Sequence, residues 1–180
     1  MNLLRLLSVT AFSLLTLTSA HAGSLTAGDR KQFDPIAAGI SAATEVTLFE
    51  GLPHQMFDRD SLATELKTKQ TVQLHGYPFY KRPLPLSAED AAALRRLLTN
   101  KASFETFGGE KACGGFHPDY SIAWAQGGQT FRVLICFGCH EFKMFGAGHE
   151  LRTDSDDTAM KKIEAILRKY HAQRPKPRNG

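Results

Sequence analysis

The residues best suited to chemistry in this chain are three cysteines and two histidines that lie close together in the sequence. The cysteines are Cys113, Cys136 and Cys139; His117 lies four positions after the first, and His140 directly follows the last. Thiolates and imidazoles are ligands of soft metal ions and of haem iron, and thiols also form disulfides. Three interpretations of this cluster therefore compete.

The first interpretation is covalent haem attachment. Residues 136–140 read Cys-Phe-Gly-Cys-His, and in these five residues the chain resembles c-type cytochromes. The resemblance implies that Cys136 and Cys139 bond the haem vinyl groups, that His140 is the proximal iron ligand and that the protein carries electrons. The motif lies inside a predicted strand, 131–145, whereas such motifs usually occupy a helical turn or an open loop, and this counts against haem.

The second interpretation is a metal site. Cys113 and His117 form one short pair of soft ligands, and Cys136 and Cys139 form another. Three cysteines and one histidine suit tetrahedral zinc or another soft divalent metal, with His140 as a spare ligand. An oxidising compartment counts against it, because thiolates there are vulnerable unless metal binds early.

The third interpretation is a structural disulfide between Cys113 and either Cys136 or Cys139, which would add about 2–4 kcal/mol of stability. One cysteine is then left over, buried or reactive. Pairing of Cys136 with Cys139 is disfavoured, because three residues of regular strand span about 10 Å. A thioredoxin-like redox pair is disfavoured too, because that motif opens a helix and residues 141–146 do not have a helical pattern. We assign no catalytic residue and favour binding over catalysis.

The N-terminal residues 1–22 are typical of a secretory signal peptide. Arg5 supplies the positive charge, an apolar stretch runs from Leu6 to Leu17, and small residues precede a cleavage point after Ala22. We expect an exported protein, periplasmic or secreted, in a compartment where disulfides persist. The sequence after the signal contains no second apolar run long enough to span a bilayer.

Composition limits the remaining classes. The chain has 180 residues, 42% of them hydrophobic and 22% charged, which is typical of one globular domain and excludes wholesale disorder. We place a single domain at 23–172 and a basic flexible tail at 173–180. Such a tail can contact an anionic surface, although solubilisation is the commoner role, and export excludes nucleic acid as a partner.

The elements that must position the cluster indicate an α+β fold with a small antiparallel sheet flanked by two or three helices. Alternation predicts a hairpin over about 120–137, with Gly127-Gly128 as its turn and an extended segment at 142–145 after it. Gly146-Ala147-Gly148 closes that segment. We further expect strands at 42–50 and 71–75, helices at 60–67 and 155–170, and a loose lead-in over 23–34. Another helix is predicted after a cap at Ser87, with Ala91, Leu94, Leu97 and Leu98 on one face.

Four segments resemble a group of uncharacterised bacterial exported proteins. They are GLPH at 51–54, HGYPFY at 75–80, CGGFHPDY at 113–120 and CFGCHE at 136–141. The resemblance implies a bacterial periplasmic or secreted setting and brings no activity with it. Our first hypothesis is an exported soluble protein with a metal-binding Cys/His cluster. The alternatives are a haem-bearing electron carrier and a disulfide-stabilised, non-enzymatic interaction module of the cell envelope.

Overall fold

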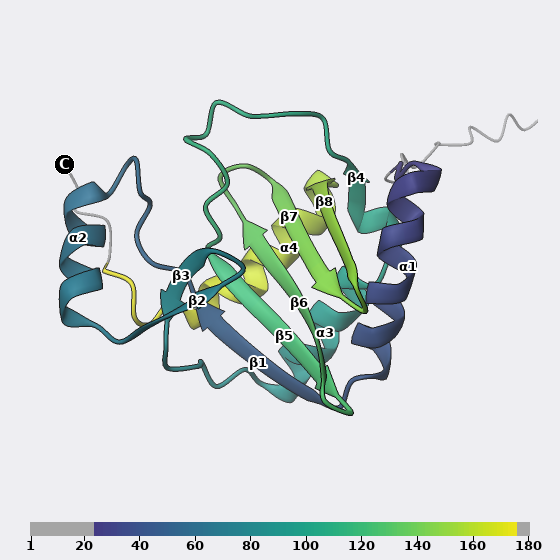
Figure 1. The fold of residues 1–180 in the computed structure, drawn as a ribbon, viewed down its shortest axis with the longest axis horizontal. Coiled ribbons are helices and arrows are strands. Elements are labelled where there is room, and N and C mark those ends of the chain that lie inside the picture. The colour runs from purple at the N-terminus through teal and green to yellow at the C-terminus, as the bar shows by residue number, and fades with distance from the viewer. Residues whose placement is uncertain (1–23, 176–180) are drawn as a thin grey trace, which may run out of the picture.

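A computed structural model describes residues 24–175 of the chain, so the predicted signal segment 1–22 lies outside the described residues. The fold is α+β, as the sequence predicts, with four α-helices, a six-stranded antiparallel sheet and a two-stranded ribbon within this range (Figure 1). Among residues 24–175, no helix has both the length and the apolar character needed to cross a membrane.

The helices are α1 (Ala27–Ala42), α2 (Arg59–Thr68), α3 (Ala88–Leu98) and α4 (Asp157–Leu167), with short 3-10 turns η1 (Lys101–Ser103) and η2 (Arg168–Tyr170). The strands are β1 (Glu45–Glu50), β2 (Thr71–Leu74), β3 (Tyr77–Tyr80), β4 (Phe104–Thr106), β5 (Tyr120–Gln126), β6 (Gln129–Cys136), β7 (Glu141–Gly146) and β8 (His149–Ser155). The large sheet has the order β1-β5-β6-β7-β8-β4, and β2 pairs with β3.

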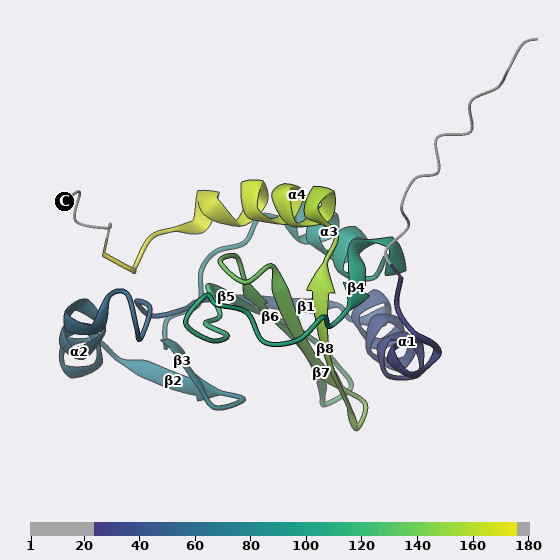
Figure 2. The same cartoon turned by 90° about the horizontal axis from the view of Figure 1, so that it is seen from above.

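The main core lies between one face of the large sheet and the helices α1, α3 and α4. Strand β6 alternates as predicted: Phe131, Val133 and Ile135 enter this core, whereas Leu134 and Cys136 face the other way. Trp124 of β5 is fully buried, as expected. Figure 2 shows α3 and α4 together on one side of the sheet and the β2–β3 ribbon on the opposite side.

A second, smaller core covers the opposite face of the sheet. Phe79 of β3 and Phe116 of the segment before β5 pack here with Leu134 and Cys136 of β6 and with Cys139. All three cysteines therefore lie on the side of the sheet that faces away from α3 and α4, where the β2–β3 ribbon and loops cover the strands.

Two elements differ from the sequence prediction. Helix α1 occupies most of the expected lead-in, because Thr26 and Asp29 form a capping box and Phe33, Ile36 and Ile40 make a buried stripe. The predicted elements also lack strand β8: Gly146-Ala147-Gly148 is a hairpin turn rather than the end of the sheet. The last helix accordingly begins at Asp157, after its N-cap Asp156.

The predicted strand across the cysteine motif is wrong. Strand β6 ends at Cys136, residues 137–140 form a turn, and β7 begins at Glu141, directly opposite Cys136 in the ladder. The reversal brings Cys139 back beside Cys136, with the Cys139 N–H donating to the Cys136 Sγ at 3.3 Å. The distance argument against contact between these two residues therefore fails, because it assumed a straight strand.

Candidate functional site

An open cleft of about 1360 Å³ contains most of the chemically interesting side chains. Four segments line it: 53–61 at the start of α2, 111–119 before β5, the 136–139 turn, and 168–175 after α4. Because these segments are far apart in the sequence, only the folded chain forms the cleft.

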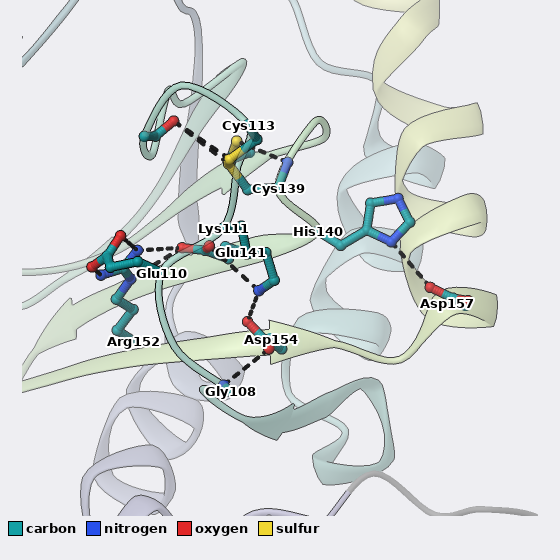
Figure 3. Close-up of polar contacts among 12 residues, drawn as sticks. Gly108, Glu110, Lys111, Cys113, Cys139, His140, Glu141, Arg152, Asp154 and Asp157 are labelled. Atoms are coloured by element: carbon teal, nitrogen blue, oxygen red, sulfur yellow. Dashed lines mark hydrogen bonds and ion pairs between the residues drawn. A yellow bond between two sulfur atoms is a disulfide. The ribbon is translucent and has the colours of Figure 1, made fainter.

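A disulfide between Cys113 and Cys139 lies in the wall of the cleft (Figure 3). Of the two pairings that the sequence left open, the structure contains this one, and Cys136 is the free, buried cysteine. The bond ties the segment before β5 to the turn between β6 and β7. The disulfide interpretation therefore has direct structural support.

The glycines after Cys113 let its segment approach the start of α2 closely. Gly114 has φ 81°, and a Cβ at this position would lie 2.9 Å from Cε1 of His54 and 3.1 Å from Sδ of Met56. A larger residue would be strained and would push the two walls apart. The CGG sequence therefore keeps the disulfide next to His54 and Met56.

The free thiol of Cys136 lies beneath the disulfide. Its Sγ accepts a hydrogen bond from the backbone N–H of Cys139, and a second from the backbone N–H of His117. Burial raises the pKa of the Cys136 thiol, and the Asp119 and Glu141 carboxylates raise it further, although the two N–H donors act in the opposite direction. The resting group is therefore a neutral thiol.

The ring of His117 is held by the backbone at Leu52, just before the 53–61 segment of the cleft, and not by a cysteine. Its Nε2 lies 2.8 Å from the carbonyl oxygen of Leu52, and its ring centroid is 4.6 Å from that of His54. Burial lowers the pKa of both imidazoles. Both rings are therefore uncharged near neutral pH, and Nδ1 of His54 accepts the Met56 N–H at 3.0 Å.

His140 points away from the disulfide. Its Nδ1 lies 3.0 Å from Oδ1 of Asp157 at the start of α4, and its backbone has φ 52° (Figure 3). The predicted haem-ligand histidine and the predicted haem-binding thiols thus face different surroundings. In this structure one of those thiols, Cys139, is already bonded to Cys113.

The described residues 24–175 hold no group of three or more His, Cys, Asp or Glu side chains arranged to bind a metal ion. The proposed ligands Cys113, His117, Cys136 and Cys139 do lie in one region, but two of them are joined in the disulfide. Zinc binding and haem attachment stay predictions that would require the reduced protein.

Asp119 connects two walls of the cleft. Its Oδ2 accepts the Phe137 N–H at 2.8 Å, and its Oδ1 lies 2.8 Å from Nη1 of Arg174. The backbone N–H of Gln173 donates to Oε2 of the buried Glu50 at 2.6 Å. Residues 173 and 174, placed in a tail by the sequence, therefore lie against the sheet, and residues 176–180 are outside the described range.

A largely buried ionic network fixes the segment that carries Cys113. Glu141 of β7 accepts hydrogen bonds from Nη2 of Arg152 at 2.8 Å and from Nζ of Lys111 at 3.4 Å. Lys111 also pairs with Asp154 of β8 (Figure 3). Lys111 precedes Cys113 by two residues, so the network and the disulfide hold the same stretch of chain against the sheet.

The sequence predicts no site role for Phe57 or Arg174, and both line the cleft. Phe57 carries only a local signal, as an apolar residue in an otherwise polar stretch. Asp119 and Arg174 are far apart in the sequence, and no spacing rule connects them.

Comparisons with known proteins add no family. No protein-family model matches the chain, and no curated protein matches it. A solved structure named "Putative Lipoprotein from Clostridium perfringens" aligns with a TM-score of 0.38 and 9% identity, covering 77% of this chain and 95% of that one. At this TM-score the likeness supports no statement about fold or activity.

Proposed function

We propose that the protein is an exported, disulfide-stabilised binding protein whose cleft holds an extended polypeptide segment of a partner. The observation that carries the proposal is the cleft itself, open, built from four chain segments and edged by exposed apolar side chains. Export is supported by the signal-like residues 1–22 and by the disulfide, which persists in oxidising compartments.

The size of the cleft favours a polypeptide over a small molecule. Its volume of about 1360 Å³ exceeds the roughly 300–1,000 Å³ that is usual for sites that enclose one small ligand. An open cleft of this size would leave a small ligand largely in water. An extended chain can instead contact several walls at once.

The rim of the cleft offers apolar anchors. Met56 and Phe57 are 56% and 67% exposed, which is unusual for large apolar residues in this structure. Methionine adapts to different partner shapes, and aromatic residues are enriched where proteins bind each other. Both side chains line the cleft, so they can receive apolar side chains of a bound segment.

The interior of the cleft is lined by polar side chains that are held in place before binding. His54 Nδ1 accepts the Met56 N–H at 3.0 Å, His117 Nε2 lies 2.8 Å from the Leu52 carbonyl oxygen, and Asp119 pairs with Arg174. The disulfide and the Lys111–Glu141 contact hold one wall, and the Asp119–Arg174 pair holds another. Such preorganisation lowers the entropy lost on binding.

The test is a peptide selection followed by measured affinities. A displayed peptide library is selected on the oxidised mature protein, and enriched peptides are titrated by fluorescence anisotropy. We expect Phe57→Ala to weaken binding about tenfold or more, as for an aromatic anchor at an interface. Leu66→Ala is the matched control, because Leu66 is a 46% exposed apolar residue of α2 that does not line the cleft.

The proposal fails if no peptide is enriched, or if enriched peptides bind both variants as they bind the parent protein. Equal weakening by both variants would show that the surface of α2 and of the residues just before it, rather than the cleft, makes the contact. Binding that is lost only with Phe57→Ala supports the cleft.

A further inference from the structure

The three cysteines form an arrangement that a purely structural disulfide does not require. A thiol lies against the backbone of a cysteine that is itself in a disulfide: Cys136 Sγ is 3.3 Å from the Cys139 nitrogen. Cys136 is not an isolated cysteine, because it shares a turn with Cys139 and a small core with both disulfide partners. A free thiol next to a disulfide is the geometry from which thiol–disulfide exchange begins.

The turn after Cys136 brings Cys139 close enough for a Cys136–Cys139 bond, which a straight strand would prevent by holding the two residues about 10 Å apart. Strand β6 stops at Cys136, and the His140 N–H donates to the Phe137 carbonyl at 3.3 Å, which closes a tight turn over residues 137–140. Across this reversal the Cys139 N–H lies 3.3 Å from the Cys136 Sγ, so the two residues lie next to each other. Position 138 faces open space, since a Cβ there would meet nothing within 4 Å, so neighbouring groups do not hinder a movement of the turn.

We propose that Cys136 exchanges with the Cys113–Cys139 disulfide, so that the cleft is a thiol–disulfide exchange site for disulfide-containing substrates. The Cys136 thiolate attacks Sγ of Cys139, a Cys136–Cys139 bond forms, and the Cys113–Cys139 bond breaks with its electron pair on Cys113. The proton lost by Cys136 passes to solvent in the cleft. No oxidant or reductant is consumed in this step.

The exchange moves the free thiol from a buried position to an accessible one. Cys136 and Cys139 are 2% and 3% exposed, whereas Cys113 is half-buried in the wall of the cleft beside His54. The released Cys113 thiolate can attack a disulfide R–S–S–R′, forming a Cys113–S–S–R bond and expelling R′–S⁻, which takes up a proton. Substrate chemistry is thus a disulfide, carried by a small molecule or by a polypeptide.

The groups around the Cys136 sulfur control the rate at which it attacks the Cys139 sulfur. Two backbone N–H groups face its sulfur and favour the thiolate, whereas burial and the nearby carboxylates of Asp119 and Glu141 oppose it. His117 faces the sulfur only through its backbone, because its ring is bonded to the Leu52 carbonyl. The exchange is therefore slow at neutral pH and accelerates as the thiolate fraction rises with pH.

Trypsin separates the two disulfide isomers cleanly. Cleavage after Lys111, Arg132 and Lys143 places Cys113 in peptide 112–132 and both other cysteines in peptide 133–143. The resting isomer gives the two peptides joined by a disulfide. The exchanged isomer gives peptide 133–143 closed on itself and peptide 112–132 free to carry an adduct.

The experiment incubates the oxidised mature protein with oxidised glutathione and, in a parallel arm, with a disulfide-bonded peptide. Acid quenching, alkylation of free thiols and digestion without reductant precede mass spectrometry. We expect an adduct on peptide 112–132 together with the internally closed peptide 133–143. An adduct in both arms indicates a general disulfide substrate, and an adduct in one arm identifies the source.

Two variants make the outcome decisive. Cys136→Ala keeps the Cys113–Cys139 bond and has no free thiol, so we expect no adduct. Cys113→Ser leaves only Cys136 and Cys139, and we expect them to pair, giving no alkylated thiol in the folded or the denatured protein. An adduct on Cys136, two unpaired thiols in Cys113→Ser, or no exchange after prolonged incubation at alkaline pH overturns the proposal. None of these results depends on peptide binding at Phe57.

Discussion

Removing the Cys113–Cys139 bond should lower the free energy of unfolding by about 3.5 kcal/mol. The bond spans 26 positions in the sequence. The chain-entropy relation for a cross-linked loop of that length gives an entropy change of about 12 cal/mol/K, hence about 3.5 kcal/mol at 25 °C. For a domain of this size the corresponding fall in Tm is about 10 °C.

The perturbation is the double substitution Cys113→Ala/Cys139→Ala in the mature protein. Urea unfolding followed by tryptophan fluorescence is a suitable assay, because Trp124 is fully buried in the main core and reports its loss. Cys136→Ala is the matched control. It removes one buried sulfur, keeps the disulfide and should cost about 1 kcal/mol.

Either of two results would refute the reasoning. A loss below about 1 kcal/mol would mean that the segment before β5 is already constrained in the unfolded chain, so that the cross-link adds little. A loss far above 3.5 kcal/mol would mean that the bond supports native packing of the small core around Phe116 and Leu134. The unfolding slope m distinguishes these cases, since a cross-link that limits the unfolded chain lowers the surface exposed on unfolding.

Three further predictions test the contacts that shape the cleft. Asp119→Ala should cost about 2–3 kcal/mol in urea unfolding, because it removes the carboxylate partner of Arg174 and leaves the Phe137 N–H unpaired; a cost below 0.5 kcal/mol, on the order of a neutral surface change, contradicts this. Stability should fall as pH decreases from about 7.5 to 5.5, because burial lowers the pKa of His117 and His54 and the unfolded chain then binds more protons. His117→Gln should shrink that difference, and an unchanged difference would exclude His117 as its source. Tyr80→Phe leaves the buried Glu65 carboxylate without its hydroxyl donor and should cost about 1–3 kcal/mol and speed amide exchange in α2, whereas Tyr77→Phe, which disturbs only Lys143, should not affect α2.

Local sequence determined the elements whose signals are short-range. The alternation of Phe131, Val133 and Ile135 against Leu134 and Cys136 gave β6 and its two faces correctly. Gly127-Gly128 correctly predicts the hairpin turn, and both glycines have positive φ angles, 56° and 79°. Ser87 correctly predicts the start of α3, since its side chain accepts the Asp90 N–H. Each of these features depends on residues within a few positions of one another, so one sequence is enough to predict them.

Competing local signals explain the errors. The polar composition of 23–34 shows no clear period and predicts a loose lead-in, yet the Thr26–Asp29 capping box and the burial of Phe33 and Ile36 stabilise a helix there. Strand β8 reads as polar because Glu150, Arg152 and Asp154 point to the face of the ionic network, while its other side is buried.

The cysteine and histidine types and their spacing were visible in the sequence, but the chemistry they share was not. The sequence by itself determined an α+β chain with signal-like residues at its start and a cluster of soft side chains around a hairpin. Only the tertiary structure decided that Cys113 bonds Cys139, that His140 turns to Asp157 and that Asp119 meets Arg174. Contacts between residues that are far apart in the sequence depend on how strands and loops reverse in three dimensions. Local propensities do not determine which distant residues come together.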